Sequence, residues 1–292
     1  MKVLAFGEVL WDIINDDDHL GGAPLNFAAH FVKCGGDAAI MSKLGKDQRG
    51  ETAYERINKL GVDASYVQWD DQHPTGTVPI KLVNGQPEYF IVPGVAYDFI
   101  DFDAAKDQLD QDHFDVLYFG TVAQRGASGE TLKKVIENHS FKHRFYDVNL
   151  RKDCYNEAII RFSLANTDIF KVSEEEINEI SLMLFETKLQ QADFIRRLIK
   201  LYPNIKHVII TAGGDGCYVY DKLALHHIKS EPVHVVDAIG AGDSFSAAFM
   251  YTYVNTADAI KSATIANKIG GFVAASSGAI PEYSEEIKGL FS

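Results

Sequence analysis

The eight residues 237–244, DAIGAGDS, combine carboxylates with conformationally free residues directly ahead of an apolar stretch. The spacing of the apolar residues that follow predicts a helix, and the preceding VHVV (233–236) predicts the end of a strand. Gly240 and Gly242 cost backbone entropy that an ordinary loop avoids. We therefore interpret the turn as an anion site, because unpaired amides and the helix dipole both favour negative charge there. Asp243 would repel such an anion unless its role is chemical.

Composition limits the classes of protein that fit this sequence. With 292 residues and 46% hydrophobic content, the chain can form one large α/β domain, or a domain with an appendage. The net charge of −13 argues against nucleic acid or an anionic membrane surface as a partner.

Cysteine usage and targeting patterns indicate the compartment. Cys34, Cys154 and Cys217 form no CxxC pair, which fits a reducing environment and predicts no structural zinc, and the ten histidines show no metal-binding spacing. No signal-peptide pattern and no apolar run of roughly 20 residues is present. These patterns predict a soluble, cytoplasmic protein.

The order of predicted elements indicates the fold class. Strands are predicted at 2–7, 10–14, 38–45, 115–120, 143–148, 168–172 and 207–211. Helices are predicted at 25–34, 47–60, 127–139, 156–165, 174–182 and 187–201, the first with Pro24 in its opening turn and glycines past its end. This alternation predicts a parallel sheet covered on both faces, whose ligands bind at the carboxyl ends of the strands.

One segment interrupts the alternation. Residues 77–92 form two β-rich runs joined by Asn84-Gly85, which predicts a hairpin. We expect it to form a small lid, built from about 10–20 and 75–100.

Polar and glycine residues gather at the predicted strand ends. They are Asp12, Gly21-Gly22, Asp147–Arg151, Ser173–Glu176, Thr211–Gly216 and Asp237–Asp243. One such group alone is ordinary turn chemistry. Six groups on one edge of a sheet predict a ligand site.

Two motifs resemble those of a known family. GGAPLNFAAHFVKCG (21–35), continuing to Lys43-Leu44-Gly45, and DAIGAGDSFSAAFM (237–250) resemble the two signatures of the ribokinase-like, pfkB-type carbohydrate kinases. GEVLWD, GGAPLN, PTGTV and DVNLR are most similar to the fructokinase branch. The resemblance implies a three-layer α/β/α kinase domain over 1–292, with a mostly parallel central sheet and a small β-sheet lid. It also implies ATP and Mg²⁺ as cofactors, and a homodimer formed through the lid.

The resemblance gives the anion site a function. It implies that Asp243 is the base that deprotonates a sugar hydroxyl, and that the amides of Gly240, Ala241 and Gly242 stabilise the transferring phosphoryl group. The simpler interpretation is that Asp243 caps the helix.

Five residues are candidates for binding the sugar. Asp12, Gly22 and Asn26 match the sugar-contacting positions of the family. Arg151 in DVNLR and Arg125 in GTVAQR follow predicted strands. Either arginine could clamp a phosphate or pair with a carboxylate.

Four further residues match the nucleotide-binding positions of the family. In TAGGDG (211–216) these are Thr211, Gly213 and Gly216, although GGDG is also an ordinary hairpin sequence. Asn267 is a candidate near the adenine, or a solvated helical asparagine.

Two departures from the family pattern concern the cations. In KVSEEE, Ser173 replaces the asparagine of the Asn-x-x-Glu motif and is a fifth candidate for binding the nucleotide. Glu176 of this motif is retained as a candidate to bind magnesium through water. Ala238 stands where the family usually has a hydroxyl residue, which weakens the case for a monovalent-cation site and leaves potassium open.

Other function classes fit less well. A dehydrogenase would carry GxGxxG after its first strand, and a P-loop kinase would carry GxxxxGK[ST]; neither pattern occurs. A non-catalytic sugar-binding regulator would not need Asp243. The sequence therefore predicts an ATP-dependent kinase acting on a sugar primary hydroxyl, most similar to fructokinase, with 2-keto-3-deoxygluconate kinase or a ribokinase-type enzyme as alternatives.

Overall fold

The computed structural model describes residues 1–14, 17–83, 86–221 and 224–291. The chain forms two compact units. The first unit comprises 1–29, 37–142 and 150–155, and the second comprises 30–36, 143–149 and 156–292.

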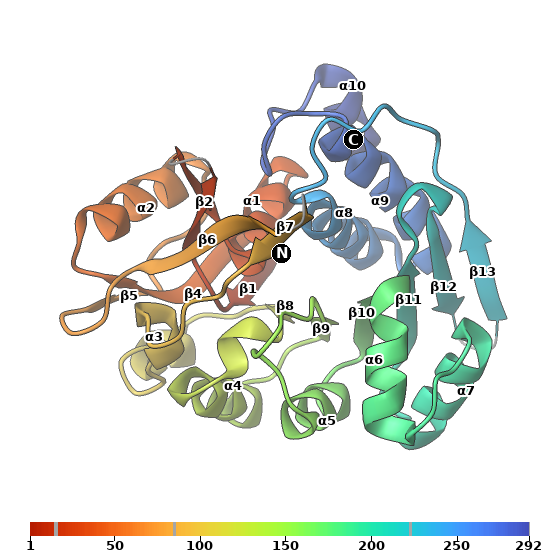
Figure 1. Cartoon of the computed structure of the whole chain (residues 1–292), viewed down its shortest axis with the longest axis horizontal. Helices are drawn as coiled ribbons and strands as arrows, with labels where there is room; N and C mark the ends of the chain where they lie inside the picture. Colours follow the sequence, from red (N-terminus) through yellow and green to blue (C-terminus); the bar gives the residue numbers. More distant parts are fainter. Residues whose placement is uncertain (15–16, 84–85, 222–223, 292) are drawn as a thin grey trace. The chain divides into compact units, whose positions relative to one another are not determined.

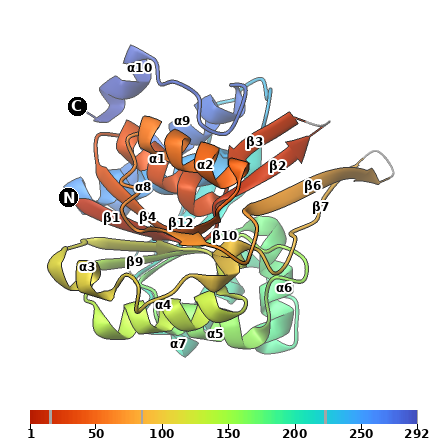
Figure 2. The ribbon, with the colours of Figure 1, turned by 90° about the vertical axis from the view of Figure 1, so that its left-hand side faces the viewer.

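The first unit contains a parallel sheet with strand order β8-β1-β4-β5. Its strands are β1 (Lys2–Phe6), β4 (Asp37–Gly45), β5 (Val67–Asp70) and β8 (Val116–Phe119). The helices are α1 (Ala23–Lys33, whose last residues belong to the second unit), α2 (Gln48–Lys59), α3 (Lys106–Gln111) and α4 (Ala127–Asn138). Figure 2 shows α1 and α2 on one face of these strands and α3 and α4 on the other. Two strands of this sheet, β8 and β1 after Lys2, are continuous buried apolar runs, because both faces are covered there.

A second, four-stranded sheet also belongs to the first unit, with strand order β3-β2-β6-β7. Its strands are β2 (Leu10–Ile14), β3 (Asp17–Gly21), β6 (Gly76–Val83) and β7 (Gln86–Tyr89). The strands of the predicted hairpin are present as β6 and β7, while Asn84-Gly85 lies outside the described residues. The second strand ends at Tyr89 rather than at 92, because the carbonyls of Ile91 and Val92 accept hydrogen bonds from the side chain of Arg125.

The second unit contains five strands in the order β13-β12-β11-β10-β9. Its strands are β9 (His143–Asp147), β10 (Ile169–Ser173), β11 (His207–Thr211), β12 (Cys217–Asp221) and β13 (Ala224–Ile228). The first three are parallel, and the last two continue the sheet as antiparallel strands that the sequence analysis did not predict.

Helices cover both faces of this second sheet (Figures 1 and 2). They are α5 (Glu157–Ala165), α6 (Glu174–Phe185) and α7 (Gln191–Leu201) on one face, and α8 (Ala241–Thr256) and α9 (Ala259–Ala274) on the other, followed by the short α10 (Glu285–Lys288). Aromatic rings fill the interface between α8 and the sheet: Phe249 of α8 packs on Phe145 of β9 with ring centroids 6.3 Å apart. The predicted fold class, an α/β protein with a mostly parallel sheet and a small separate sheet, is confirmed.

The prediction that residues 233–236 end a strand is wrong. These residues form no strand, and Val235 and Val236 are 58% and 59% exposed. The amides of Val236 and Asp237 donate instead to the carbonyl of Ala274 at the end of α9, at 2.8 and 3.1 Å. Three valines in four residues favour a strand locally, but the helix end supplies the hydrogen-bond acceptor here.

Candidate active site

The glycine turn ahead of α8 has the local geometry of an anion site. Gly240 is the N-cap residue of α8 with φ = 79°, a left-handed conformation that favours glycine. The first amide of the helix to find an intrahelical acceptor is that of Ser244, which donates to the Gly240 carbonyl at 2.8 Å. The amide of Ala241 donates to the Ala238 carbonyl, outside the helix, at 3.3 Å. A helix leaves its first N–H groups without intrahelical acceptors, so the start of α8 is a place where amides can face an anion. A 16-residue helix adds its positive dipole end to these amides.

The two glycines of the turn have different reasons to be glycine. A Cβ on Gly240 would lie 2.5 Å from the carbonyl oxygen of Ala279 and 2.9 Å from its Cα, so the backbone itself excludes a side chain. A Cβ on Gly242 would meet only Lys171 Nζ, at 3.6 Å, which is an ordinary contact. The protein interior therefore requires glycine at 240 but not at 242.

Asp243 is not the cap of the helix. The N-cap is Gly240, and Asp243 is the third residue of α8, half-buried in its first turn. The simpler interpretation of Asp243 as an N-cap is thus wrong. The turn precedes it as predicted, although it follows an irregular segment and not a strand.

A buried charged network that the sequence analysis missed lies beside this turn. Lys171 Nζ donates to both carboxylate oxygens of Asp147, at 2.9 and 2.8 Å, and Ser246 Oγ donates to one of them at 2.8 Å. All three residues are at most 6% exposed. A buried ion pair is retained only where its hydrogen bonds are satisfied. A lysine inside the otherwise apolar strand IFKVS was the available signal.

A cavity of about 730 Å³ in the second unit begins at this turn. It lies within the size range of small-molecule sites. Five of the predicted nucleotide-binding residues line it together with two residues of the turn: Ser173, Thr211, Gly213, Gly216, Asn267, Ala241 and Gly242. These residues come from four separate segments of the sequence and meet around one cavity.

The wall of this cavity is partly apolar, which the sequence analysis did not anticipate. Pro232, Val233, Val235 and Phe245 line it together with glycine and alanine residues of α9. The exposed Val233 and Val235 of the irregular segment therefore form part of the cavity wall. Apolar walls with a few polar groups are typical of small-molecule sites.

The TAGGDG segment is both a hairpin turn and part of the cavity. It joins the antiparallel strands β11 and β12 and contributes Thr211, Gly213 and Gly216 to the cavity. Gly216 has φ = 93°, and a Cβ there would lie 2.1 Å from the carbonyl oxygen of Ile228. The predictions of a hairpin and of a nucleotide-binding turn therefore do not exclude each other for this segment.

Asn267 of α9 is 9% exposed, so it is not a solvated helical asparagine. Its Nδ2 donates to the Ile228 carbonyl at 2.9 Å, which fixes the end of β13 at the cavity.

Ser173 and Glu176 form a capping box at the start of α6. The Ser173 amide donates to Glu176 Oε2 at 2.8 Å, and the Glu176 amide donates to Ser173 Oγ at 3.3 Å. Glu174 and Glu175 line the cavity, whereas Glu176 does not. Among the residues that the structure describes, no group of three or more His, Cys, Asp or Glu side chains could hold a metal ion.

The predicted sugar-binding residues belong to the first unit. Asp12 lies in the middle of β2 of the small sheet, where it pairs with His19 of β3. The prediction that it lies at a strand end of the large sheet is therefore wrong. Burial raises the pKa of the Asp12 carboxyl to about 6, against the opposing charges of Arg151 and His19. Its Oδ2 lies against Gly21, where a Cβ would be 2.7 Å away.

Gly22 and Asn26 open α1 directly after this strand pair. Gly22 has φ = 112°, and a Cβ there would lie 2.3 Å from the Glu8 carbonyl oxygen. Its own carbonyl accepts from the Asn26 amide at 2.9 Å, and Asn26 is 4% exposed. Gly22 directly follows Gly21, against which the Asp12 carboxylate lies, and Asn26 comes one helical turn after Gly22.

The two candidate arginines differ in their surroundings. Arg125 Nε donates to Asp98 at 2.7 Å, and its Nη2 donates to the Val92 carbonyl at 2.6 Å and to the Tyr97 hydroxyl at 2.9 Å. This favours, of the two interpretations, pairing with a carboxylate. Arg151 donates to the Leu150 carbonyl at 3.0 Å and acts electrostatically on Asp12.

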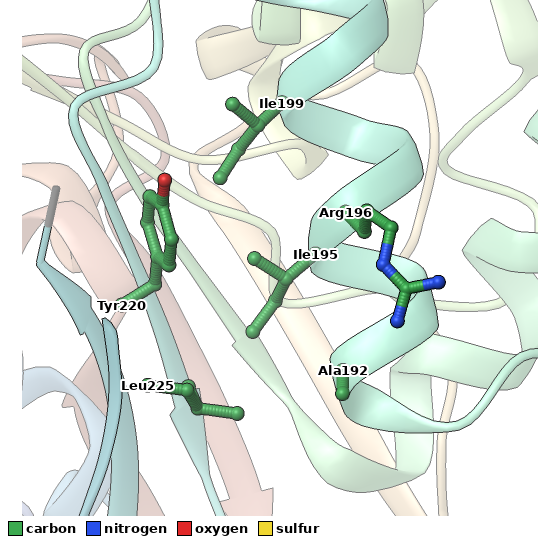
Figure 3. Close-up of a pocket in the computed structure, with 6 residues that line it drawn as sticks. All are labelled: Ala192, Ile195, Arg196, Ile199, Tyr220 and Leu225. Atoms are coloured by element: carbon green, nitrogen blue, oxygen red, sulfur yellow. The ribbon is translucent and has the colours of Figure 1, made fainter. Parts of the chain in front are cut away.

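A smaller cavity of about 330 Å³ lies elsewhere in the second unit (Figure 3). Ile195 and Ile199 of α7 point toward Tyr220 of β12 and Leu225 of β13. It contains none of the predicted site residues, and its lining is largely apolar.

Comparison with known proteins identifies the class. Residues 6–286 match the pfkB family of carbohydrate kinases, and the chain belongs to this family. It is 28% identical to an Escherichia coli fructokinase over 265 residues, 85% of this chain and 83% of the relative.

Solved structures agree with this assignment. An uncharacterized sugar kinase from Pyrococcus horikoshii superposes with a TM-score of 0.84 at 26% identity over the full length of both chains. A Vibrio cholerae fructokinase, solved with fructose, ADP and calcium, has the same fold, with a TM-score of 0.84 at 21% identity over 99% of this chain and 98% of that one. The resemblance in the two glycine-rich motifs is thereby confirmed, and the protein is a carbohydrate kinase. No helix among the described residues is long and apolar enough to span a membrane.

Proposed function

We propose that this carbohydrate kinase transfers the γ-phosphoryl group of ATP to a primary hydroxyl of fructose. The observation that carries the proposal is the cavity of the second unit, where the predicted nucleotide-binding residues and the glycine turn line the same space. A nucleotide seated there would have its phosphates toward the start of α8 and its base toward the apolar wall.

The turn and Lys171 would stabilise the transferring group. The amides of Gly240, Ala241 and Gly242 and the dipole of α8 present fixed positive charge, which needs no reorganisation during reaction. Lys171 Nζ, next to Gly242, adds a cation held in place by Asp147. This combination explains how an anion is tolerated so close to the Asp243 carboxylate.

Asp243 would act as the base. Its carboxylate accepts the proton of the sugar primary hydroxyl as that oxygen forms its bond to the γ-phosphorus, while the bond from phosphorus to the bridging oxygen of ADP breaks. The products are a sugar phosphate and ADP.

Magnesium would neutralise charge on the ATP phosphates. The carboxylates of Glu174 and Glu175 at the cavity, and of Glu176 in the capping box, suit a cation that keeps several waters and binds phosphate oxygens. We propose Glu176 as the residue that acts on the metal through water.

Asp12, Gly22 and Asn26 would bind the sugar. A carboxylate and an amide can hold neighbouring hydroxyls in a fixed geometry, from which selectivity follows. We further propose that the small sheet of β2, β3, β6 and β7 acts as a lid that excludes water and forms the contact of a homodimer.

The charges of the arginines support a neutral sugar over 2-keto-3-deoxygluconate, which carries a carboxylate. Arg125 already has Asp98 as its counter-ion, and Arg151 acts on Asp12. A buried carboxylate needs an uncompensated cation. The fructokinase relatives support the same choice.

Measuring ADP release with fructose, ribose and 2-keto-3-deoxygluconate tests this proposal. We expect fructose to exceed the keto-deoxy acid in kcat/KM at least tenfold, about 1.4 kcal/mol. Arg125→Ala should not selectively disable sugar binding, because Arg125 pairs with Asp98. A preference for the acid that is lost in Arg125→Ala would contradict the fructose assignment, and no phosphorylation of any sugar would favour a non-catalytic regulator.

A further inference from the structure

A buried histidine of α1 contacts the segment that packs against the glycine turn. His30 is 0% exposed and hydrogen-bonds through both ring nitrogens: Nε2 lies 2.8 Å from the Ala279 carbonyl oxygen and Nδ1 lies 2.8 Å from the Tyr283 hydroxyl. A carbonyl only accepts, so Nε2 carries the proton. Burial lowers the pKa of His30 to about 4, so the ring is neutral and Nδ1 accepts from Tyr283.

Ala279 lies directly against Gly240. Its carbonyl oxygen, Cα and Cβ would all be within 2.9 Å of a Cβ on Gly240. The carbonyl that His30 holds is therefore the group that sets how closely the two backbone segments approach. Gly240 in turn is the N-cap residue of α8, so its position determines the direction of the amides that follow.

A second link joins the same two segments. Asp237 accepts from the Ile239 amide at 2.9 Å and from the Gly278 amide at 3.3 Å. The turn is thus tied to Gly278 by a carboxylate on one side, while His30 fixes the next residue from the other side. All of these residues belong to the second unit.

We propose that His30 is a positioning residue for phosphoryl transfer: its Nε2–H fixes the Ala279 carbonyl, and through it the anion-binding amides at the start of α8. This inference rests on the proposed function of the turn. His30 does not contact the phosphates in this account. Its contribution is preorganisation of the amides, which matters most in the transition state.

The test compares two substitutions at the same position. The side-chain amide of His30→Gln can replace Nε2 as a donor to Ala279, whereas His30→Leu has a similar size and no donor. We expect His30→Leu to lower kcat at least ~10-fold at saturating ATP and fructose with the fructose KM within about twofold, because transition-state interactions are lost selectively. His30→Gln should retain at least a third of wild-type kcat.

Hydrogen–deuterium exchange of the peptide containing Gly278 and Ala279 gives a readout that needs no activity. We expect faster exchange in His30→Leu and near wild-type exchange in His30→Gln. If His30→Leu does not fold, His30→Asn replaces it, because the shorter amide reaches only the Nδ1 position. Equal kcat and equal exchange in His30→Gln and in the variant without a donor at the Nε2 position (His30→Leu or His30→Asn) would overturn the proposal. A wild-type enzyme that phosphorylates no sugar would refute the proposed function instead, and the exchange comparison would still test the link from His30 to Ala279.

Discussion

Two alanine substitutions in the glycine turn separate its catalytic role from its structural role. Gly240→Ala and Gly242→Ala make the same chemical change two residues apart. The structure predicts opposite outcomes for stability, because a Cβ at 240 meets the Ala279 backbone at 2.5 Å while a Cβ at 242 meets only Lys171 Nζ at 3.6 Å.

The magnitudes follow from these contacts and from backbone conformation. Alanine in the left-handed conformation of Gly240 costs about 1–2 kcal/mol, and displacing the Ala279 backbone adds to this, for a total of about 2–4 kcal/mol. At a helical position such as 242, alanine is favoured over glycine by about 0.5–1 kcal/mol. With roughly 2–4 °C per kcal/mol for a chain of this size, Gly240→Ala should lower Tm by about 4–16 °C and Gly242→Ala should leave it unchanged or slightly higher.

Activity should respond differently. The Cβ of a helical residue tilts toward the helix N-terminus, so in Gly242→Ala it would occupy space beside Lys171 that the phosphoryl group needs. Alanine keeps the amide donor, but its Cβ would hold the phosphoryl group away from it. We expect kcat for fructose to fall at least ~10-fold, a part of the about 10²–10³-fold cost of losing one oxyanion donor completely. The fructose KM should change by less than about twofold.

Thermal unfolding and steady-state ADP release on the two variants check this reasoning. Gly240→Ala serves as the matched control for destabilisation without a new group beside Lys171. If Gly242→Ala lost as much Tm as Gly240→Ala, or kept full kcat, the turn would have a structural role only and the anion-site assignment would be refuted.

Three further predictions address the proposed base Asp243, the proposed sugar-binding carboxylate of Asp12, and the dimer. Asp243→Asn should keep folding and ATP binding but lower kcat at least ~10²-fold; more than half of wild-type turnover would exclude Asp243 as the base. Because the folded pKa of Asp12, about 6, exceeds its ordinary value of 3.8, its contribution to stability is present at low pH and lost as pH rises through about 6. Asp12→Asn should therefore raise Tm at pH 8 but not at pH 4 while it raises the fructose KM, and an equal Tm change at both pH values would contradict the buried-carboxylate argument. Sedimentation should show a dimer at micromolar concentration, since exposed strand edges and residues such as Phe90, 59% exposed, invite pairing; a monomer would remove the lid-to-lid contact.

Most of the local elements and the glycine turn could be predicted from the sequence. Pro24 and the glycines after α1, the apolar runs of the strands, and the pair Gly240 and Gly242 act through local backbone preferences, which nearby residues set. The strand predicted at 233–236 shows the limit of such preferences, because its hydrogen-bond acceptor, Ala274, lies almost 40 residues further along the chain.

The partners of the buried polar side chains could not be predicted, because they depend on contacts between distant parts of the chain. Ser246 reaches Asp147 across 99 residues of sequence, and His30 reaches Tyr283 across 253. These polar groups pair because burial removes their water and leaves only distant protein groups as hydrogen-bond partners. Nothing in their neighbours along the chain specifies those partners, so the sequence could indicate Asp243, its glycines and Asp147, but not the contacts of Asp147 with Lys171 and Ser246 or the contacts of His30.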